Sequence, residues 1–191
     1  MLKSISNVYV ISNNTERYNK FKILFESFGF KDIHFWKDCH IENEPVLGCS
    51  VSHYSLVRYA LEIGLPYILV FEDDAVPCND AYTKTLKLIN NRPEDCTYLI
   101  LGWIASERQN NETYEKSSNF NIIAGAHAYA LFGRKAYEEY LKSWERNGIA
   151  DHIANDIDTS YKVNERLFCQ YTMNTGMHLA KGWAADDFRI L

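Results

Sequence analysis

Three short apolar segments, separated by stretches with helical periodicity, constrain the fold of this chain more than any other feature of its sequence. They are "VYVI" (8–11), "YILVF" (67–71) and "TYLILGW" (97–103). Each is rich in β-branched and aromatic residues and shorter than a typical helix, as expected of a strand that is buried on both faces. Two further strand-like segments are expected at "DIHFW" (32–36) and at "IIAGAHAYALF" (122–132).

The stretches between these segments repeat apolar residues every three to four positions, which predicts amphipathic helices. The expected helices span 15–29, 50–64, 80–90, 134–147 and 152–162. Asn13 to Thr15 are candidate caps for the first helix and Ser50 or Ser52 for the second, while glycines are expected to end the helices at Gly29, Gly64 and Gly148. Strands that alternate with such helices predict an α/β fold, a Rossmann-type domain with a largely parallel sheet flanked by helices.

Composition limits the classes of function. The 191 residues predict one domain, and a net charge of −5 gives no support for nucleic-acid binding. Five scattered cysteines without a CxxC pair argue against a disulfide framework or a structural zinc site and favour a reducing compartment. The start of the chain lacks the apolar core of a signal peptide, and no run suggests a transmembrane segment. We therefore expect a cytoplasmic protein, with peripheral contact at the inner face of a membrane left open.

An acidic triplet, Glu72, Asp73 and Asp74, directly follows the strand predicted at 67–71. Adjacent carboxylates repel one another and raise each other's pKa, and a hard cation such as Mg²⁺ or Mn²⁺ removes that repulsion. Because side chains alternate along an extended segment, Glu72 and Asp74 are expected on one side and Asp73 on the other. In α/β sheets ligands bind beyond the carboxyl ends of the strands, where this triplet lies. The alternative is a solvated loop start, and the triplet alone favours neither interpretation.

The flanking residues distinguish these alternatives. "GCSVSHYSLVRYALEIGLPYILVFEDDAVP" (48–77) resembles the most characteristic segment of glycosyltransferase family 25, in which Gly-Cys and Ser-His precede Pro-Tyr, an apolar strand and Glu-Asp-Asp. "GAHAYALFGRKAYEEYL" (125–141) is similar to the family's Gly-x-His-Ala-Tyr segment, and "VYVISNNTERYNKFKILFESFGF" is similar to its opening strand and helix. One departure is "SNNTER" (12–17), which stands where the family usually has "NL-x-R".

The resemblance implies a GT-A-like domain over residues 1–191 that transfers a hexose, galactose or glucose, from a UDP-sugar to a glycan or glycolipid acceptor in lipopolysaccharide biosynthesis. It also implies a Mn²⁺ or Mg²⁺ cofactor on the donor diphosphate, with Asp74 as metal ligand and Glu72 and Asp73 beside the donor. The expected course is inverting, by a single displacement in which a carboxylate deprotonates the acceptor hydroxyl. A metal-dependent phosphohydrolase and a non-catalytic sugar- or nucleotide-binding module are the alternatives.

The candidates for the catalytic base lie in "ADHIANDID" (150–158), where Asp151 and Asp156 are preferred over Asp158. Asp151 falls near the position at which the family tends to carry an acidic residue before its last helix. Its alternative role is structural, because an aspartate at a helix start is a good N-cap.

Five further residues are candidates for the donor or metal site. His53 and His127 lie in motif-like surroundings, although an isolated histidine is more often a packing residue. Arg17 follows the first strand and is expected near the nucleotide, with a solvated charge as the alternative. By similarity to GT-A enzymes, His178 is a candidate third metal ligand and Lys181 a candidate diphosphate contact, with a surface tail as the alternative. The polar segment 105–120 is a candidate lid.

Overall fold

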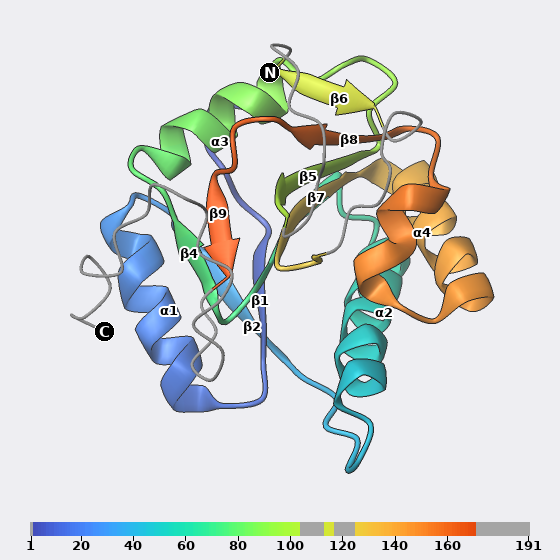
Figure 1. The fold of residues 1–191 in the computed structure, drawn as a ribbon. Helices are drawn as coiled ribbons and strands as arrows, with labels where there is room; N and C mark the ends of the chain where they lie inside the picture. Colours follow the sequence, from blue (N-terminus) through green and yellow to red (C-terminus); the bar gives the residue numbers. More distant parts are fainter. Residues whose placement is uncertain (1, 104–112, 117–124, 171–191) are drawn as a thin grey trace.

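A mixed β-sheet forms the centre of the computed structural model, which describes residues 2–103, 113–116 and 125–170. In these ranges the sheet has seven strands in the order β2-β1-β3-β7-β5-β8-β6 (Figure 1). Their bounds are β1 (Val8–Ser12), β2 (Ile33–Lys37), β3 (Tyr67–Glu72), β5 (Tyr98–Gly102), β6 (Tyr114–Lys116), β7 (Ala128–Phe132) and β8 (Ser160–Val163). A separate antiparallel pair joins β4 (Ala75–Pro77) to β9 (Phe168–Gln170).

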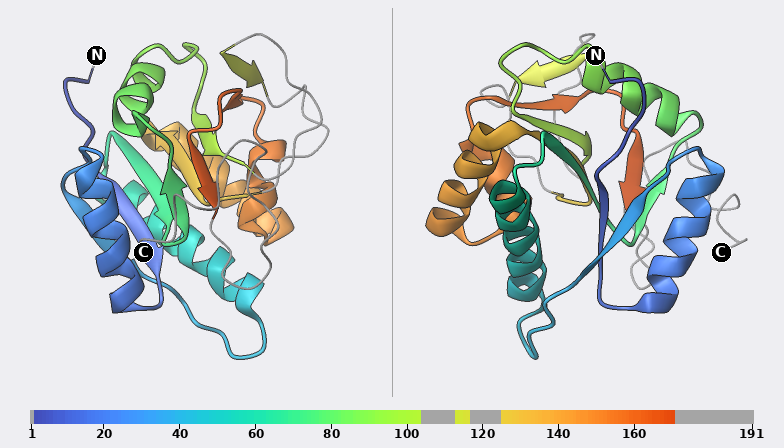
Figure 2. Two further views of the ribbon diagram at one scale, coloured as in Figure 1. Left: turned by 60° about the vertical axis from the view of Figure 1, so that its left-hand side comes forward. Right: turned by 180° about the vertical axis from the view of Figure 1, so that it is seen from behind.

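Two layers of helices cover the two faces of the sheet (Figures 1 and 2). They are α1 (Thr15–Ser27), α2 (Pro45–Ile63), α3 (Ala81–Asn90) and α4 (Gly133–Asn147), followed by the 3₁₀ helix η2 (Ala150–Asp156). One apolar core lies between the sheet and α1 and α3, and a second lies between the sheet and α2, α4 and η2. The predicted α/β fold with flanking helices is therefore confirmed.

The strand β1 shows why the apolar runs are continuous. Val8 and Val10 belong to the core on the α1 side, whereas Tyr9 and Ile11 belong to the core on the α2 side. A strand covered by helices on both faces buries every side chain, so its sequence has no polar alternation.

The sheet is parallel at β2–β1–β3 and at β5–β8, while β7 runs antiparallel to both β3 and β5, and β6 antiparallel to β8. A reversed strand thus occupies the middle of the sheet.

Among the described residues no helix is both long and apolar enough to cross a membrane. The assignment of 1–191 to a single domain stays a prediction.

Most predicted helix ends are confirmed. Asn14 caps α1 by accepting hydrogen bonds from the backbone N–H groups of Glu16 and Arg17, at 2.8 and 3.2 Å. Gly64 and Gly148 end α2 and α4 in the left-handed conformation, with φ of 71° and 68°.

The start of α2 was predicted wrongly. The helix begins at Pro45, whose fixed φ suits the first helical position, and not at 50. Ser50 and Ser52 are therefore buried inside the helix and do not cap it. The hydroxyl of Ser52 bonds to the carboxylate of Asp38 and, at 2.6 Å, accepts from the backbone N–H of Cys39. These bonds hold the chain between β2 and α2.

The helix predicted at 152–162 is also wrong. The segment forms only η2 and then turns into β8, which pairs parallel to β5. The strand pattern is hidden because Lys162 is fully buried, where an apolar residue would be expected. Its ammonium lies 2.7 Å from the carboxylate of Glu115, which is also buried, so the charge is compensated inside the fold. The strand expected over 122–132 begins at Ala128, and 117–124 lie outside the described residues.

Gly48 lies in α2 against the backbone of the segment that leads into the helix. A Cβ at this position would stand 2.3 Å from the carbonyl oxygen of Cys39. We expect Gly48→Ala to destabilise the protein by about 1–3 kcal/mol through overpacking. This is the opposite of the usual effect, because alanine inside a helix is more favourable than glycine by about 1 kcal/mol. Thermal unfolding measures this as a Tm lower by about 2–4 °C per kcal/mol. Glu62→Ala, on the exposed part of α2, is the control, and an unchanged or higher Tm for Gly48→Ala would contradict the close approach.

Candidate functional site

The carboxyl ends of β1 and β3 meet the beginning of β7 at one edge of the sheet. Ile11 of β1 is in register with Glu72 of β3, and Phe71 is in register with Ala128 of β7. Backbone hydrogen bonds continue past the strand ends, from the N–H of Glu72 to the carbonyl of His127 at 3.1 Å and from the N–H of Asp73 to that of Ile11 at 3.2 Å. The acidic triplet is therefore held between β1 and β7.

The three carboxylates point to different partners. Glu72 contacts α2, and Asp73 contacts the end of β1 and the first turn of α1. The side-chain amide of Gln170, on β9, donates to Glu72 at 3.3 Å and to Asp74 at 3.1 Å. The prediction that Glu72 and Asp74 share one side is thus confirmed, with Asp73 directed elsewhere.

Glu72 is fixed by a histidine inside α2. The Nε2 of His53 lies 3.1 Å from Oε1 of Glu72, and its Nδ1 lies 2.9 Å from the hydroxyl of Tyr129. Burial alone would raise the pKa of Glu72, but the hydrogen bond and charge of His53 outweigh it and keep this pKa below its ordinary value. His53 is fully buried, so it positions Glu72 and does not reach the surface.

Asp73 joins the end of β1 and the start of α1 to the triplet. Its two oxygens accept hydrogen bonds from the hydroxyl of Ser12 and from the guanidinium of Arg17. Burial raises the pKa of Asp73 even though both partners oppose the shift. The side chain of Arg17 stays 49% exposed, so it remains accessible to an anion beside the triplet. The structure thus brings the predicted residue Arg17 to the predicted site.

Asp74 is the least satisfied of the three carboxylates. Burial, followed by the charge of Glu72, raises the pKa of Asp74 to about 7. Its Oδ2 accepts from Gln170, whereas its buried Oδ1 has no hydrogen-bond partner among the described residues. A buried carboxylate oxygen without a donor is costly in the charged form, and a divalent cation removes that cost. Asp74 therefore fits the role of a Mg²⁺ or Mn²⁺ ligand.

His127 lies just before β7, and its backbone carbonyl accepts the hydrogen bond from the N–H of Glu72. It is buried, and burial lowers its pKa. Its Nε2 lies 3.3 Å from the carbonyl of Phe168, and a Cβ on Gly102 would stand 2.4 Å from the same nitrogen. Gly102 thus provides the space in which this imidazole sits. His127 lies at the predicted site as an interior residue.

The two preferred base candidates occupy different surroundings. Asp151, in η2, accepts a hydrogen bond through Oδ1 from the backbone N–H of Ala126 at 2.8 Å, next to His127. Asp156 is exposed and accepts from Ser143 at 2.8 Å and from Asn147, both at the end of α4. The structure thus places Asp151 beside the segment that enters β7, and Asp156 in a contact that holds η2 to α4.

Two predicted residues, His178 and Lys181, lie outside the described residues, as does most of the predicted lid at 105–120.

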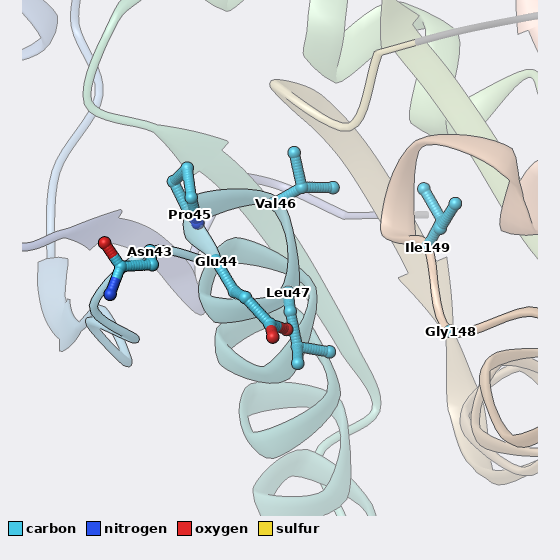
Figure 3. A pocket seen from close by; sticks show the side chains of 7 residues that line it. All are labelled: Asn43, Glu44, Pro45, Val46, Leu47, Gly148 and Ile149. Carbon is cyan, nitrogen blue, oxygen red and sulfur yellow. The ribbon is translucent and has the colours of Figure 1, made fainter.

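A cavity of about 410 Å³ opens at the start of α2 and the turn between α4 and η2 (Figure 3). It is lined by Asn43, Glu44, Pro45, Val46, Leu47, Gly148 and Ile149. The side chains of Val46 and Ile149 flank it and are 64% and 40% exposed. The cavity does not include the acidic triplet. Its lining residues Leu47 and Ile149 lie two positions along the chain from Cys49 and Asp151.

Three residues of this edge, Ser12, Tyr129 and Gln170, are not among the site candidates predicted from the sequence. Ser12 is the last residue of β1 and directly follows the apolar segment 8–11, so the rule that ligands lie at strand ends could have found it. Tyr129 is the tyrosine of the Gly-x-His-Ala-Tyr segment, so the resemblance could have pointed to it. Gln170 lies almost one hundred positions from the triplet and gives no local signal.

The chain is therefore an α/β protein that carries carboxylates at the carboxyl edge of its strands, beside a half-exposed arginine. Such a site is suited to a cation together with an anionic ligand. A family model described as glycosyltransferase family 25 (LPS biosynthesis protein) matches residues 43–143, which is more than half of the chain. The chain belongs to glycosyltransferase family 25.

Comparison with known proteins adds little beyond this family. A crystal structure of a glycosyltransferase involved in the glycosylation of the major capsid of PBCV-1 aligns at 14% identity and a TM-score of 0.48. The alignment covers 74% of this chain and 66% of that chain, slightly under two thirds of its length. No curated protein matched significantly.

The raised pKa of Asp74 has a consequence for stability. Because the pKa in the fold is about 7 and the unfolded value is about 3.9, protonation of Asp74 stabilises the fold at low pH, and this contribution is lost as the pH rises through 7. We expect Asp74→Asn to be more stable than wild type at pH 8, by at least about 1 kcal/mol or about 2–4 °C in Tm, and the difference to shrink at pH 5.

Thermal unfolding with a chelator present measures this difference across pH. The control is Asp32→Asn, which removes an exposed carboxylate and should leave the pH dependence as in wild type. A Tm difference for Asp74→Asn that is the same at both pH values would contradict the assignment.

Proposed function

We propose that the chain is a UDP-sugar-dependent hexosyltransferase that transfers galactose or glucose to a glycan or glycolipid acceptor with inversion. Family membership supports glycosyl transfer. The observation that carries the finer proposal is the buried Oδ1 of Asp74, which has no hydrogen-bond partner in the described part of the chain and lies at the carboxyl edge of the sheet.

Asp74 would hold a Mn²⁺ or Mg²⁺ ion, with Asp73 as the neighbouring carboxylate. Such an ion, when bound, neutralises the negative charge that the donor diphosphate gains as the sugar–phosphate bond breaks. Arg17 is half-exposed beside Asp73 and would bind a diphosphate oxygen. Glu72, kept anionic by His53, would accept a hydrogen bond from a ribose hydroxyl.

Asp151 is the preferred base. Its Oδ1 is fixed by the backbone N–H of Ala126, which orients the carboxylate without consuming its second oxygen. Asp156 is engaged by both Ser143 and Asn147, so removing it would disturb the contact between η2 and α4. The proposed step is direct: Asp151 takes the proton of the acceptor hydroxyl, the hydroxyl oxygen bonds to the anomeric carbon, and the bond to the diphosphate breaks.

The cavity beside α2 suits the acceptor. Its flanking side chains Val46, Leu47 and Ile149 are apolar and exposed, as expected of a surface that takes the less polar part of a lipid-linked glycan. The family description as an LPS biosynthesis protein supports an acceptor of that kind. Action in the cytoplasm, at the inner face of a membrane, is part of the proposal.

The donor site is tested by calorimetry. Asp74→Asn keeps an oxygen that can accept from Gln170 but removes the charge. We expect its affinity for UDP in the presence of Mn²⁺ to fall about 100-fold, which is about 2.7 kcal/mol, and UDP release from UDP-sugars to be lost. Asp32→Asn should bind UDP as wild type does.

Unchanged affinity of Asp74→Asn for UDP would contradict the metal assignment. Release of phosphate from simple esters without an acceptor would instead favour a phosphohydrolase. Binding without UDP release with any acceptor would favour a non-catalytic module.

The base is tested by a pH–rate profile. Asp151→Asn can still accept the hydrogen bond from Ala126, so the fold should persist while the proton acceptor is lost. We expect kcat to fall by about 10²–10⁴-fold and the rise of the rate with pH to disappear. Asp158→Asn, an exposed neighbour, should keep the wild-type profile. A wild-type rate for Asp151→Asn would move the role to Asp156 or Asp158.

A further inference from the structure

A cysteine, a histidine and a glutamate converge between α2 and the end of β3. The thiol of Cys49 lies 3.5 Å from Oε1 of Glu72, and Nε2 of His53 lies 3.1 Å from the same oxygen. The three atoms all lie within 4.8 Å of one another. Cys49 and His53 are four residues apart on one face of α2, so the helix itself sets their spacing.

The two separations from Oε1 of Glu72 are close to those between the ligands of a tetrahedral zinc ion. With Zn–S of about 2.3 Å and Zn–N and Zn–O of about 2.0–2.2 Å, tetrahedral angles place sulfur and oxygen about 3.6 Å apart and nitrogen and oxygen about 3.4 Å apart. The distances of 3.5 and 3.1 Å in the structure differ from these by a few tenths of an ångström at most. Glu72 thus already stands at ligand distances from both partners. The sulfur of Cys49 and the imidazole of His53 lie within 4.8 Å of each other, and a tetrahedral ion would bring them to about 3.6 Å.

The outer contacts of the cluster also resemble those of a metal site. The second nitrogen of His53 is bonded to the hydroxyl of Tyr129 at 2.9 Å, and the second oxygen of Glu72 accepts from Gln170 at 3.3 Å. Such contacts orient a ligating imidazole and a ligating carboxylate. The sulfur of Cys49 is half-buried and Glu72 is 16% exposed, which leaves a way in for an ion.

We propose that Cys49, His53 and Glu72 bind a thiophilic divalent cation of the Zn²⁺ class, with a fourth position open to water or a ligand. A thiolate and an imidazole select Zn²⁺ over Mn²⁺ and Mg²⁺, whereas Asp74, which offers only oxygen, favours the hard cations. The site is therefore distinct in chemistry from the proposed donor cation site, although Gln170 links Glu72 to Asp74. When the cation binds, the thiol of Cys49, which now donates a hydrogen bond to Glu72, releases its proton to solvent and binds as the thiolate.

The test is a titration of the full, metal-free chain with Co²⁺, which substitutes for Zn²⁺ and reports its ligands by absorption. We expect wild type to develop the near-ultraviolet band of a cobalt–thiolate bond and the visible bands of four-coordinate Co²⁺, and Zn²⁺ to displace both. Cys49→Ser should lose the thiolate band and bind at least about tenfold more weakly, which is the lower limit seen when even an outer partner of a metal ligand is removed.

Matched variants separate this site from others. Cys78→Ser, which removes another half-buried thiol, and Asp74→Asn should keep the band and the affinity, while Glu72→Gln should weaken binding. Absence of the band in wild type at saturating Co²⁺, or equal affinity in Cys49→Ser, would overturn the proposal. Because no donor or acceptor is present, failure here leaves the proposed transferase function standing, and failure of that function leaves this site standing.

Discussion

The pairing of the buried His53 imidazole with the carboxylate of Glu72 is the contact on which the functional edge depends. It joins the middle of α2 to the end of β3, and the hydroxyl of Tyr129 extends the same chain of hydrogen bonds to β7. The consecutive elements α2 and β3 and the distant strand β7 are thereby held at one point. A buried carboxylate needs such partners, because without them its charge would be strongly disfavoured in the interior. The pairing also leaves the half-exposed Arg17 at this edge available to a ligand.

Much of the framework could be predicted from the sequence. The strands β1, β3 and β5 are continuous apolar runs, and burial on both faces is the simplest physical reason for such runs. Gly64 and Gly148 marked helix ends because they reach the left-handed conformation without strain. The position of the acidic triplet could also be predicted. Because it directly follows a buried strand, it must lie at the carboxyl edge of the sheet.

The failures arose where a long-range contact overrides local pattern. Strand β8 was mistaken for a helix because its buried Lys162 is compensated by Glu115, a residue of another strand. Ser52 was expected to cap a helix, but it lies inside α2 and bonds to Asp38 from the preceding segment. Gln170 belongs to the edge only through the pairing of β9 with β4. No local rule contains these partners, so the sequence alone could not reveal them.

The reversed direction of β7 affects how an edge of this kind can change over evolution. In an all-parallel sheet, only the loops that leave the strands reach the carboxyl edge. Here the segment that enters β7 reaches it as well and supplies His127 and the backbone N–H that holds Asp151. Two kinds of loop, one leaving strands and one entering a strand, can therefore lengthen or shorten independently around the same carboxylates. This offers related sequences a way to diversify the ligand that they accept while the core stays the same.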